Sequence, residues 1–168
     1  MSNEYRGNRW YKCDLHLHTP ASECFEDKSI TPQQFIDVVI KNGINCIAIT
    51  DHNTAEWIDN IRDIAKKKDI IVFPGVEVTC SDSKVHLLIL FEIDYPKVRI
   101  EDFLVKIDID RGLFGKTSAH SNKGINEVVK IANEVGALVI PAHIDDYNGI
   151  GLVSPQIRRE FWKLDSIN

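Results

Sequence analysis

Short apolar runs of strand type alternate with segments of helical periodicity along this chain of 168 residues. Such an alternation of strands and helices favours a parallel sheet, either open or closed into a barrel. The spacing predicts strands over residues 11–18, 45–50, 70–73, 85–91, 137–141 and 164–167. The sequence therefore predicts a fold of the α/β class.

Helix signals lie between most of these strands. Thr31-Pro32-Gln33-Gln34 is a capping box with proline at the first helical position, and the helix that it opens is expected to stop at Gly43. The segment Asn53–Glu56 is expected to cap the next helix. Further helices are predicted over residues 101–109, over 122–135 and from 154 onward, and an exposed loop is predicted over 110–123.

Composition restricts the class of protein. The 25 acidic and 20 basic residues give a net charge of -5, which argues against a protein that coats duplex DNA. With 43% apolar residues the chain can bury a core of its own, so we expect one domain over residues 1–168. No apolar stretch is long enough to cross a bilayer, and no secretory signal is visible. The four cysteines lack paired spacing, which indicates free thiols and, most simply, a cytoplasmic protein.

The histidines are placed where a ligand site is expected. Five of the six lie at the carboxyl end of a predicted strand or just past it, with one partial exception early in its strand: His16, His18, His52, His143 and, as the exception, His86. Glu77 follows the third strand in the same way. In parallel α/β folds these strand ends converge on the binding site. One such histidine alone is usually structural, but five beside a carboxylate indicate a metal centre.

Individual motifs suit metal chemistry. His16 and His18 lie on one strand face, roughly 6–7 Å apart, and Asp14 on the same face is placed to orient a ligand. Asp51 precedes His52 at a turn into a helix and is a candidate ligand or orienting group. A glutamate in a valine-rich segment is otherwise costly to bury, so Glu77 is suited to bridging two metals.

Other polar residues receive weaker interpretations. His120 lies in the loop rich in serine, glycine and lysine, and we expect it at the surface, outside the pocket. Cys24 is a candidate soft ligand, although an ordinary free thiol is the more usual interpretation. Arg111, Lys116 and Lys123 precede the fifth strand and are candidates for binding a substrate phosphate.

At this point the sequence resembles the PHP (polymerase and histidinol phosphatase) family. Five motifs, all between residues 11 and 145, carry the resemblance: Asp14–Thr19, Ile49–His52, Pro74–Glu77, His86–Leu88 and Ala142-His143. Two further stretches, Thr19–Ser22 and Pro141–Asp145, are similar to the PHP domain at the head of TrlF-type AAA-like ATPases. The resemblance implies a distorted (βα)7 TIM-like barrel with up to three Zn, Mn or Fe ions.

The resemblance also implies a ligand set. His16, His18 and Glu77 would hold the first metal. Glu77, His86 and His143 would hold the second, so that Glu77 bridges the two sites.

The third metal has fewer assigned ligands. The resemblance assigns it His52 together with Cys24 or Glu23, where family members often have histidine or aspartate. Family members also complete the site with a C-terminal Asp-x-His, and this chain stops before one. We therefore expect a barrel truncated at its C-terminal end, two firmly held metals and an incomplete third site. Dimerisation or pairing with a missing C-terminal segment would cover the open edge.

The main hypothesis is a metal-dependent phosphoesterase acting on a phosphomonoester or phosphodiester of a nucleotide or nucleic acid. A hydroxide bridging two metals would attack phosphorus, with Asp14 and Asp51 assisting. The alternative is a catalytically weak regulatory module that binds metal and acts with an ATPase portion or a partner. Hydrolysis of C–N bonds, as in amidohydrolases, is a third alternative, but no predicted strand end carries the lysine that those enzymes usually need.

Overall fold

The computed structural model describes residues 10–164 of the chain. In that part five strands form: β1 (Cys13–Leu17), β2 (Cys46–Ile49), β3 (Ile71–Thr79), β4 (His86–Leu90) and β5 (Leu138–Pro141). They are accompanied by α1 (Pro32–Lys41), α2 (Ile58–Ala65), α3 (Lys97–Lys106), α4 (Ile125–Glu134) and α5 (Pro155–Phe161). The first five predicted strands are thus confirmed in position. The sixth, over 164–167, lies outside the described residues except for Leu164, which is not in a strand.

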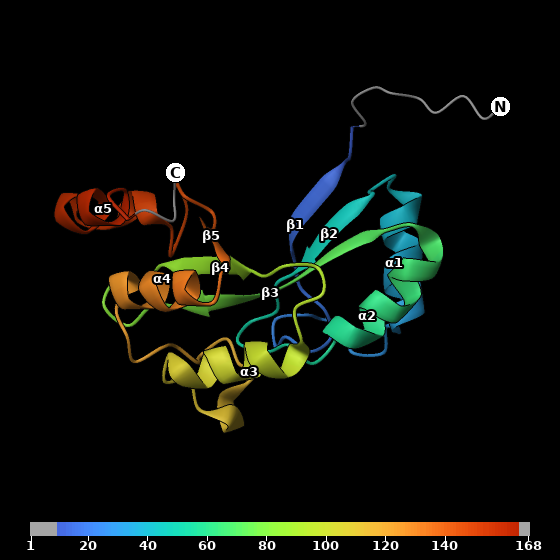
Figure 1. Ribbon diagram of the computed structural model, residues 1–168, viewed down its shortest axis with the longest axis horizontal. Coiled ribbons are helices and arrows are strands. Elements are labelled where there is room, and N and C mark those ends of the chain that lie inside the picture. The colour runs from blue at the N-terminus through green and yellow to red at the C-terminus, as the bar shows by residue number, and fades with distance from the viewer. Residues whose placement is uncertain (1–9, 165–168) are drawn as a thin grey trace.

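The five strands form one curled sheet in the order β1-β2-β3-β4-β5 (Figure 1). β1, β2 and β3 are parallel, whereas β4 is antiparallel to both β3 and β5. The prediction of an entirely parallel sheet is therefore wrong for β4. Only residues 80–85 connect β3 to β4, and a parallel crossover needs a dozen residues or more. The short connection forces β4 to run back along β3.

β3 is longer than the sequence predicted. It continues through Pro74 and Gly75 and includes Glu77, which we had expected to follow the strand. Residues 71–74 pair with β2, and residues 75–79 pair with β4. Pro74 stands where the partner changes. At Gly75 a Cβ atom would lie 2.7 Å from Leu90 Cδ2 and 2.9 Å from Ile89 O, so only glycine fits.

The helices cover one face of the sheet. Figure 1 shows α1 and α2 beside the β1–β3 half, and α3 and α4 beside the other half. Alternate strand residues pack against these helices in the main core, among them Ile47, Ile49, Val76, Val78, Leu87 and Ile89. The opposite face carries a smaller apolar cluster with Ala48, Leu88, Leu90 and Ala142. Because side chains alternate along a strand, Glu77 and His86 project from that opposite face.

Helix boundaries confirm part of the prediction. The capping box of α1 is present, with Gln34 N–H donating to Thr31 Oγ1 over 3.3 Å and Thr31 N–H donating to Gln34 Oε1 over 2.9 Å. The cap predicted at Asn53–Glu56 is wrong, because α2 begins only at Ile58. The side chain of Asn53 donates instead to the carbonyl oxygens of Lys116 and Ala119.

Two other segments differ from expectation. α3 begins at Lys97, four residues before the predicted 101–109 helix, and ends at Lys106. The segment 110–123 is a loop with a 3-10 turn at Arg111–Leu113, but it is not exposed throughout, since Ala119 and Ser121 are buried. Among residues 10–164 no helix is long and apolar enough to span a membrane.

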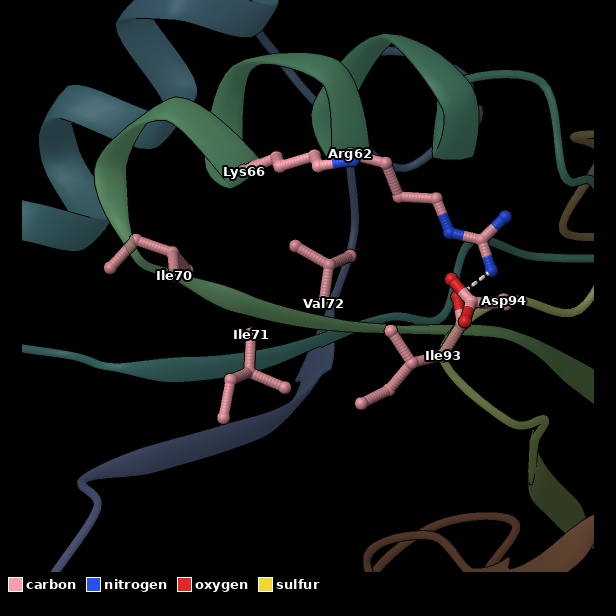
Figure 2. A pocket seen from close by; sticks show the side chains of 7 residues that line it. All are labelled: Arg62, Lys66, Ile70, Ile71, Val72, Ile93 and Asp94. Atoms are coloured by element: carbon pink, nitrogen blue, oxygen red, sulfur yellow. Dashed lines mark hydrogen bonds between the residues drawn. The ribbon is translucent and has the colours of Figure 1, made fainter.

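A hollow of about 380 Å³ lies under α2 at the start of β3 (Figure 2). Its floor is apolar, with Ile70, Ile71 and Val72. The Arg62 side chain at its wall has a structural role, because its guanidinium donates to the backbone oxygens of Ile93 and Tyr95. The hollow is at the opposite end of β3 from Glu77, and the hydrogen bonds of Arg62 anchor α2 to the segment after β4.

Candidate metal centre

Glu77 is the centre of a cluster of imidazoles. Its side chain is only 1% exposed, and five ring nitrogens surround the two carboxylate oxygens. Oε2 lies 3.2 Å from His16 Nε2, 3.2 Å from His18 Nε2 and 3.4 Å from His52 Nδ1, and Oε1 lies 2.9 Å from His86 Nδ1 and 3.4 Å from His143 Nε2. The carboxylate thus divides the histidines into two sets.

Backbone pairing brings these side chains together. His52 and Glu77 form a parallel bridge, in which Glu77 N–H donates to Asp51 O over 3.1 Å and Asn53 N–H donates to Glu77 O over 3.0 Å. His86 begins β4 opposite the end of β3. His143 lies just past β5 at a φ of 29°.

The loop after β1 holds residues of the cluster through hydrogen bonds. Ser22 Oγ accepts a hydrogen bond from His52 N–H over 2.7 Å and lies 3.3 Å from His18 Nδ1. The buried Asp51 carboxylate accepts hydrogen bonds from Thr19 N–H and Thr19 Oγ1–H, both over 2.6 Å. Both oxygens of Asp51 are therefore used to hold the loop, and Asp51 is absent from the three donor groups described below.

The electrostatics favour an ionised Glu77 carboxylate and a neutral His52 imidazole. Burial alone would raise the pKa of Glu77, but His16, His18 and His86 hold it well below its usual range. Burial lowers the pKa of His52 to about 4, against the opposing charge of Glu77. Contact with Glu77 raises the pKa of His16, although burial opposes the change. His52 is therefore neutral at neutral pH, the form in which imidazole binds metal.

Three groups of donor atoms in the described residues lie close enough together to hold a metal ion. They are His16, His18 and Glu77; Glu77, His86 and His143; and His18, Cys24 and His52. Within each group the donor atoms lie within 4.8 Å of one another. Two ligands at about 2.0–2.2 Å from one ion lie at most about 4.4 Å apart, so only small shifts are needed.

An unsatisfied nitrogen tests whether a metal fits. The buried Nε2 atom of His16 makes no hydrogen bond, although Glu77 Oε2 is 3.2 Å away. A buried polar atom without a partner is costly, and a cation between the two atoms would satisfy both. Imidazoles with a carboxylate suit Zn, Mn or Fe better than Mg or Ca, which prefer oxygen ligands. The residues present therefore fit a divalent transition metal.

Comparison with known proteins gives the family. The model of the PHP domain matches residues 14–107, more than half of the chain. The chain belongs to the PHP domain family. The match contains four of the five histidines around Glu77, and it ends before His143. The match is to the PHP domain in general, and the similarity to TrlF-type ATPases stays a prediction.

Relatives and solved structures agree with this membership. An uncharacterised protein of Methanocaldococcus jannaschii is 33% identical over 110 residues, 61% of this chain and 64% of that protein. A 5'-3' exoribonuclease of Haemophilus influenzae is 31% identical over 90 residues, 52% of this chain and 31% of that protein. The chain thus matches less than two thirds of either relative.

One solved structure supports the fold. It comes from Bifidobacterium adolescentis and is named as a candidate metal-dependent phosphoesterase. It superposes with a TM-score of 0.67 at 16% identity, covering 91% of this chain and 74% of that chain. The curled five-strand sheet is therefore a half-barrel that is consistent with a PHP-type barrel fold.

The other residues predicted for the site lie at different positions relative to the Glu77 cluster. Asp14 Oδ1 lies 3.3 Å from the backbone nitrogen of His16, and its charge contributes to the raised pKa of that histidine. Cys24 belongs to the third donor group, whereas Glu23 accepts hydrogen bonds from the backbone and hydroxyl of Thr117. His120 is exposed and belongs to none of the three groups.

The three cations predicted to bind phosphate all have acidic partners. Arg111 pairs with Glu101 and Asp102 of α3, at 3.4 and 3.5 Å. Lys123 pairs with Asp108 at 3.0 Å. Lys116 pairs with Glu23, which precedes Cys24 of the third donor group. Of the three cations, Lys116 is therefore the one that contacts a residue adjacent in sequence to a candidate ligand.

Sequence reasoning missed two polar residues of the site. Ser22 supports His18 and His52, and Asn148 contacts His86. Ser22 belongs to the stretch Thr19–Ser22, which indicated only a family similarity, and no pattern indicated Asn148. Small polar residues in loops gain such roles only through the folded arrangement.

Proposed function

We propose that this chain is a metal-dependent phosphoesterase that hydrolyses a phosphomonoester or phosphodiester of a nucleotide or nucleic acid. The observation that carries the proposal is the two-sided Glu77 carboxylate, with three histidines at one oxygen and two at the other. A carboxylate that faces two donor sets is the arrangement expected for a pair of metals that share one ligand. Metal pairs of this kind serve displacement at phosphorus.

The chain's own groups have defined tasks in this proposal. Bound metals would supply Lewis acidity and lower the pKa of water at the site. Glu77 holds the two donor sets at a fixed separation, and its ionised state balances part of the cationic charge. Asp14 orients His16 through the backbone, and Asp51 acts at one remove by fixing Thr19. Lys116 is the proposed phosphate-binding cation. Arg111 contributes only if its ion pairs with Glu101 and Asp102 of α3 break.

The substrate class is inferred from a relative and from charge. The exoribonuclease relative acts on RNA by its name. A net charge of -5 disfavours a duplex coat but is compatible with a single nucleotide or a strand end. We therefore favour a phosphate ester of a nucleotide or of nucleic acid.

We also infer the organisation of the chain and its metals. Residues 1–168 form one domain, the metal-site motifs lie within 11–145, and the strands belong to a distorted (βα)7 barrel. The curl of the sheet and its superposition on a longer solved chain support this inference. Zn, Mn or Fe would occupy the site, and two ions would be held firmly. Cys24 is an exposed residue, and partial desolvation of its thiol raises the pKa of that group, so the third group is the weakest.

The test combines metal analysis with turnover. Purified protein is analysed for metals and then assayed on phosphomonoesters, phosphodiesters and short RNA, with and without chelator. We expect about two metals per chain, activity that chelator removes, and loss of activity in Glu77→Gln, His16→Ala and His143→Ala. The loss should exceed the roughly 10–100-fold cost of removing an outer-shell partner. Glu134→Gln is the matched control, because that glutamate is exposed on α4.

Each result is informative. Metal without turnover on any substrate would favour the regulatory module. Turnover that survives in Glu77→Gln would show that the chemistry takes place elsewhere. A protein that takes up no divalent metal would refute the proposal.

A further inference from the structure

His86 is held from both sides of its ring. Its Nδ1 atom lies 2.9 Å from Glu77 Oε1, and its Nε2 atom lies 3.1 Å from the side-chain amide of Asn148. The backbone N–H of His86 also donates to Asn148 O over 2.9 Å. Asn148 lies 62 positions later in the sequence and contacts this one histidine through both its side chain and its main chain.

The loop that carries Asn148 is tightly built. Asp146 N–H donates to His143 O over 2.9 Å, and Gly149 N–H donates to Asp146 O over 2.8 Å. A Cβ atom on Gly149 would lie 2.3 Å from His143 O. Asn148 itself has a φ of 61°, a conformation that asparagine tolerates better than most residues. This loop begins at His143, one donor of the second group. Through Asn148 it also contacts His86, another donor of the same group.

A carboxamide can serve His86 in two protonation patterns. When Nδ1 carries the proton and donates to Glu77, the NH₂ group of Asn148 donates to Nε2. When the Nδ1 lone pair binds a metal, Nε2 carries the proton, and the amide oxygen accepts it after a half-turn. Metal-binding histidines generally donate the other ring N–H to an oxygen acceptor of this kind.

We propose that Asn148 is a positioning residue that sets the tautomer of His86, so that Nδ1 faces the metal shared with Glu77 and His143. The inference rests on the proposed metal centre and assigns Asn148 no contact with substrate. Neither the family resemblance nor the sequence pattern pointed to this residue.

Three variants isolate the side chain. Asn148→Gly removes the amide, while glycine keeps the positive φ and the carbonyl that accepts from His86. Asn148→Asp keeps an oxygen acceptor on the same stem and also tolerates this backbone conformation. Asn133→Ala is the matched control, because that asparagine is exposed on α4.

The experiment measures the Zn²⁺ affinity of the metal-free full chain by competition with a chromophoric chelator. It is done at about pH 8, above the unperturbed pKa of imidazole. We expect Asn148→Gly to lose about 10–100-fold in affinity at one site, and Asn148→Asp and Asn133→Ala to stay close to wild type. Proton–nitrogen correlation spectra of the zinc-loaded protein should show His86 protonated at Nε2 in wild type and Asn148→Asp, and a mixture in Asn148→Gly.

The outcomes separate this inference from the proposed function. If Asn148→Gly binds zinc like wild type with an unchanged His86 tautomer, or if Asn148→Asp weakens binding as much as Asn148→Gly, the inference is wrong while the metal centre stands. If wild type binds neither Zn²⁺ nor, in a parallel titration, Mn²⁺, the metal centre and the inference are both wrong.

Discussion

At the scale of single residues, one carboxylate organises the centre. Glu77 would be costly in an apolar sheet if it had no partners. Five imidazoles surround it instead, and they keep its pKa low despite burial. Polar side chains hold the other ring nitrogen of some of these imidazoles: Ser22 contacts His18, and Asn148 contacts His86. The geometry of the centre therefore depends on small polar residues as well as on the donors.

Ser22→Ala should destabilise the protein by about 1–3 kcal/mol. The substitution removes the acceptor of the buried His52 N–H and leaves that group unsatisfied. Urea unfolding of the metal-free protein measures the effect. Ser29→Ala is the control, because its hydroxyl bonds to Asp27 at the surface, and it should change stability by less than about 0.5 kcal/mol. Equal effects of the two variants would contradict the role of Ser22.

At the scale of elements, β3 determines the architecture. Its first half pairs in parallel with β2 and its second half pairs antiparallel with β4. The change takes place at Pro74-Gly75, two residues before Glu77. Proline lacks the N–H group that a continued ladder would use, and glycine admits β4 at close range. The position of Glu77 therefore depends on this junction.

Gly75→Val should cost about 1–3 kcal/mol of stability and also reduce metal uptake. The added carbons would meet Leu90 Cδ2 and Ile89 O, so that β3 and β4 must separate beside Glu77. Thermal unfolding and metal analysis of the same samples check both effects. Gly43→Ala is the control: it has open space but a φ of 66°, so a loss of about 1 kcal/mol with unchanged metal uptake is expected. Full metal content in Gly75→Val would refute the coupling.

The sequence predicted much of this architecture because periodicity and capping are local signals. The positions of the first five strands and the capping box at Thr31 are confirmed. The reversal of β4 was missed because the periodicity of residues 85–91 carries no direction. The length of β3 was missed because Pro74-Gly75 resembles a break. Asn53 resembled a cap, but its partners are the carbonyl oxygens of Lys116 and Ala119, more than 60 residues away.

The candidate site was predictable to a similar extent. Strand ends that carry histidine indicated five of the residues that the structure brings to Glu77. The supporting contacts were not predictable, because Asp51, Ser22 and Asn148 act through partners that only the fold supplies. Asp51 in particular was expected as a ligand or an orienting group, and its carboxylate holds Thr19.

At the scale of the whole molecule, metal content should fall with pH. Protons compete with metal for imidazole nitrogens, so binding weakens as pH falls through the pKa of each ligand. Because the pKa of His16 is raised and that of His52 is lowered to about 4, His16 is protonated at a higher pH than His52 as the solution is acidified. Dialysis from about pH 7.5 to 5, followed by elemental analysis, should show progressive loss. Metal content unchanged down to about pH 4.5 would exclude imidazole ligation as described.

The sheet also predicts how the whole chain associates. β1 and β5 are its edge strands within residues 10–164, and an edge exposes unpaired backbone groups. Leu138 on β5 is 54% exposed and lines an apolar hollow with Leu15, Phe73 and Leu90 on the face away from the helices. A second copy of the chain that pairs along such an edge would cover both features. Light scattering should therefore give a mass about twice the 19.1 kDa of one chain.

Leu138→Lys tests this association directly, because a charged side chain on an edge strand opposes pairing with another edge. We expect this variant to shift the protein toward monomer with unchanged metal content, since Leu138 belongs to none of the donor groups. Leu152→Lys is the control: that leucine is 68% exposed but lies in a 3-10 turn outside the sheet, so the variant should remain dimeric. A wild-type monomer at every concentration tested would show that the exposed edges are tolerated without a partner.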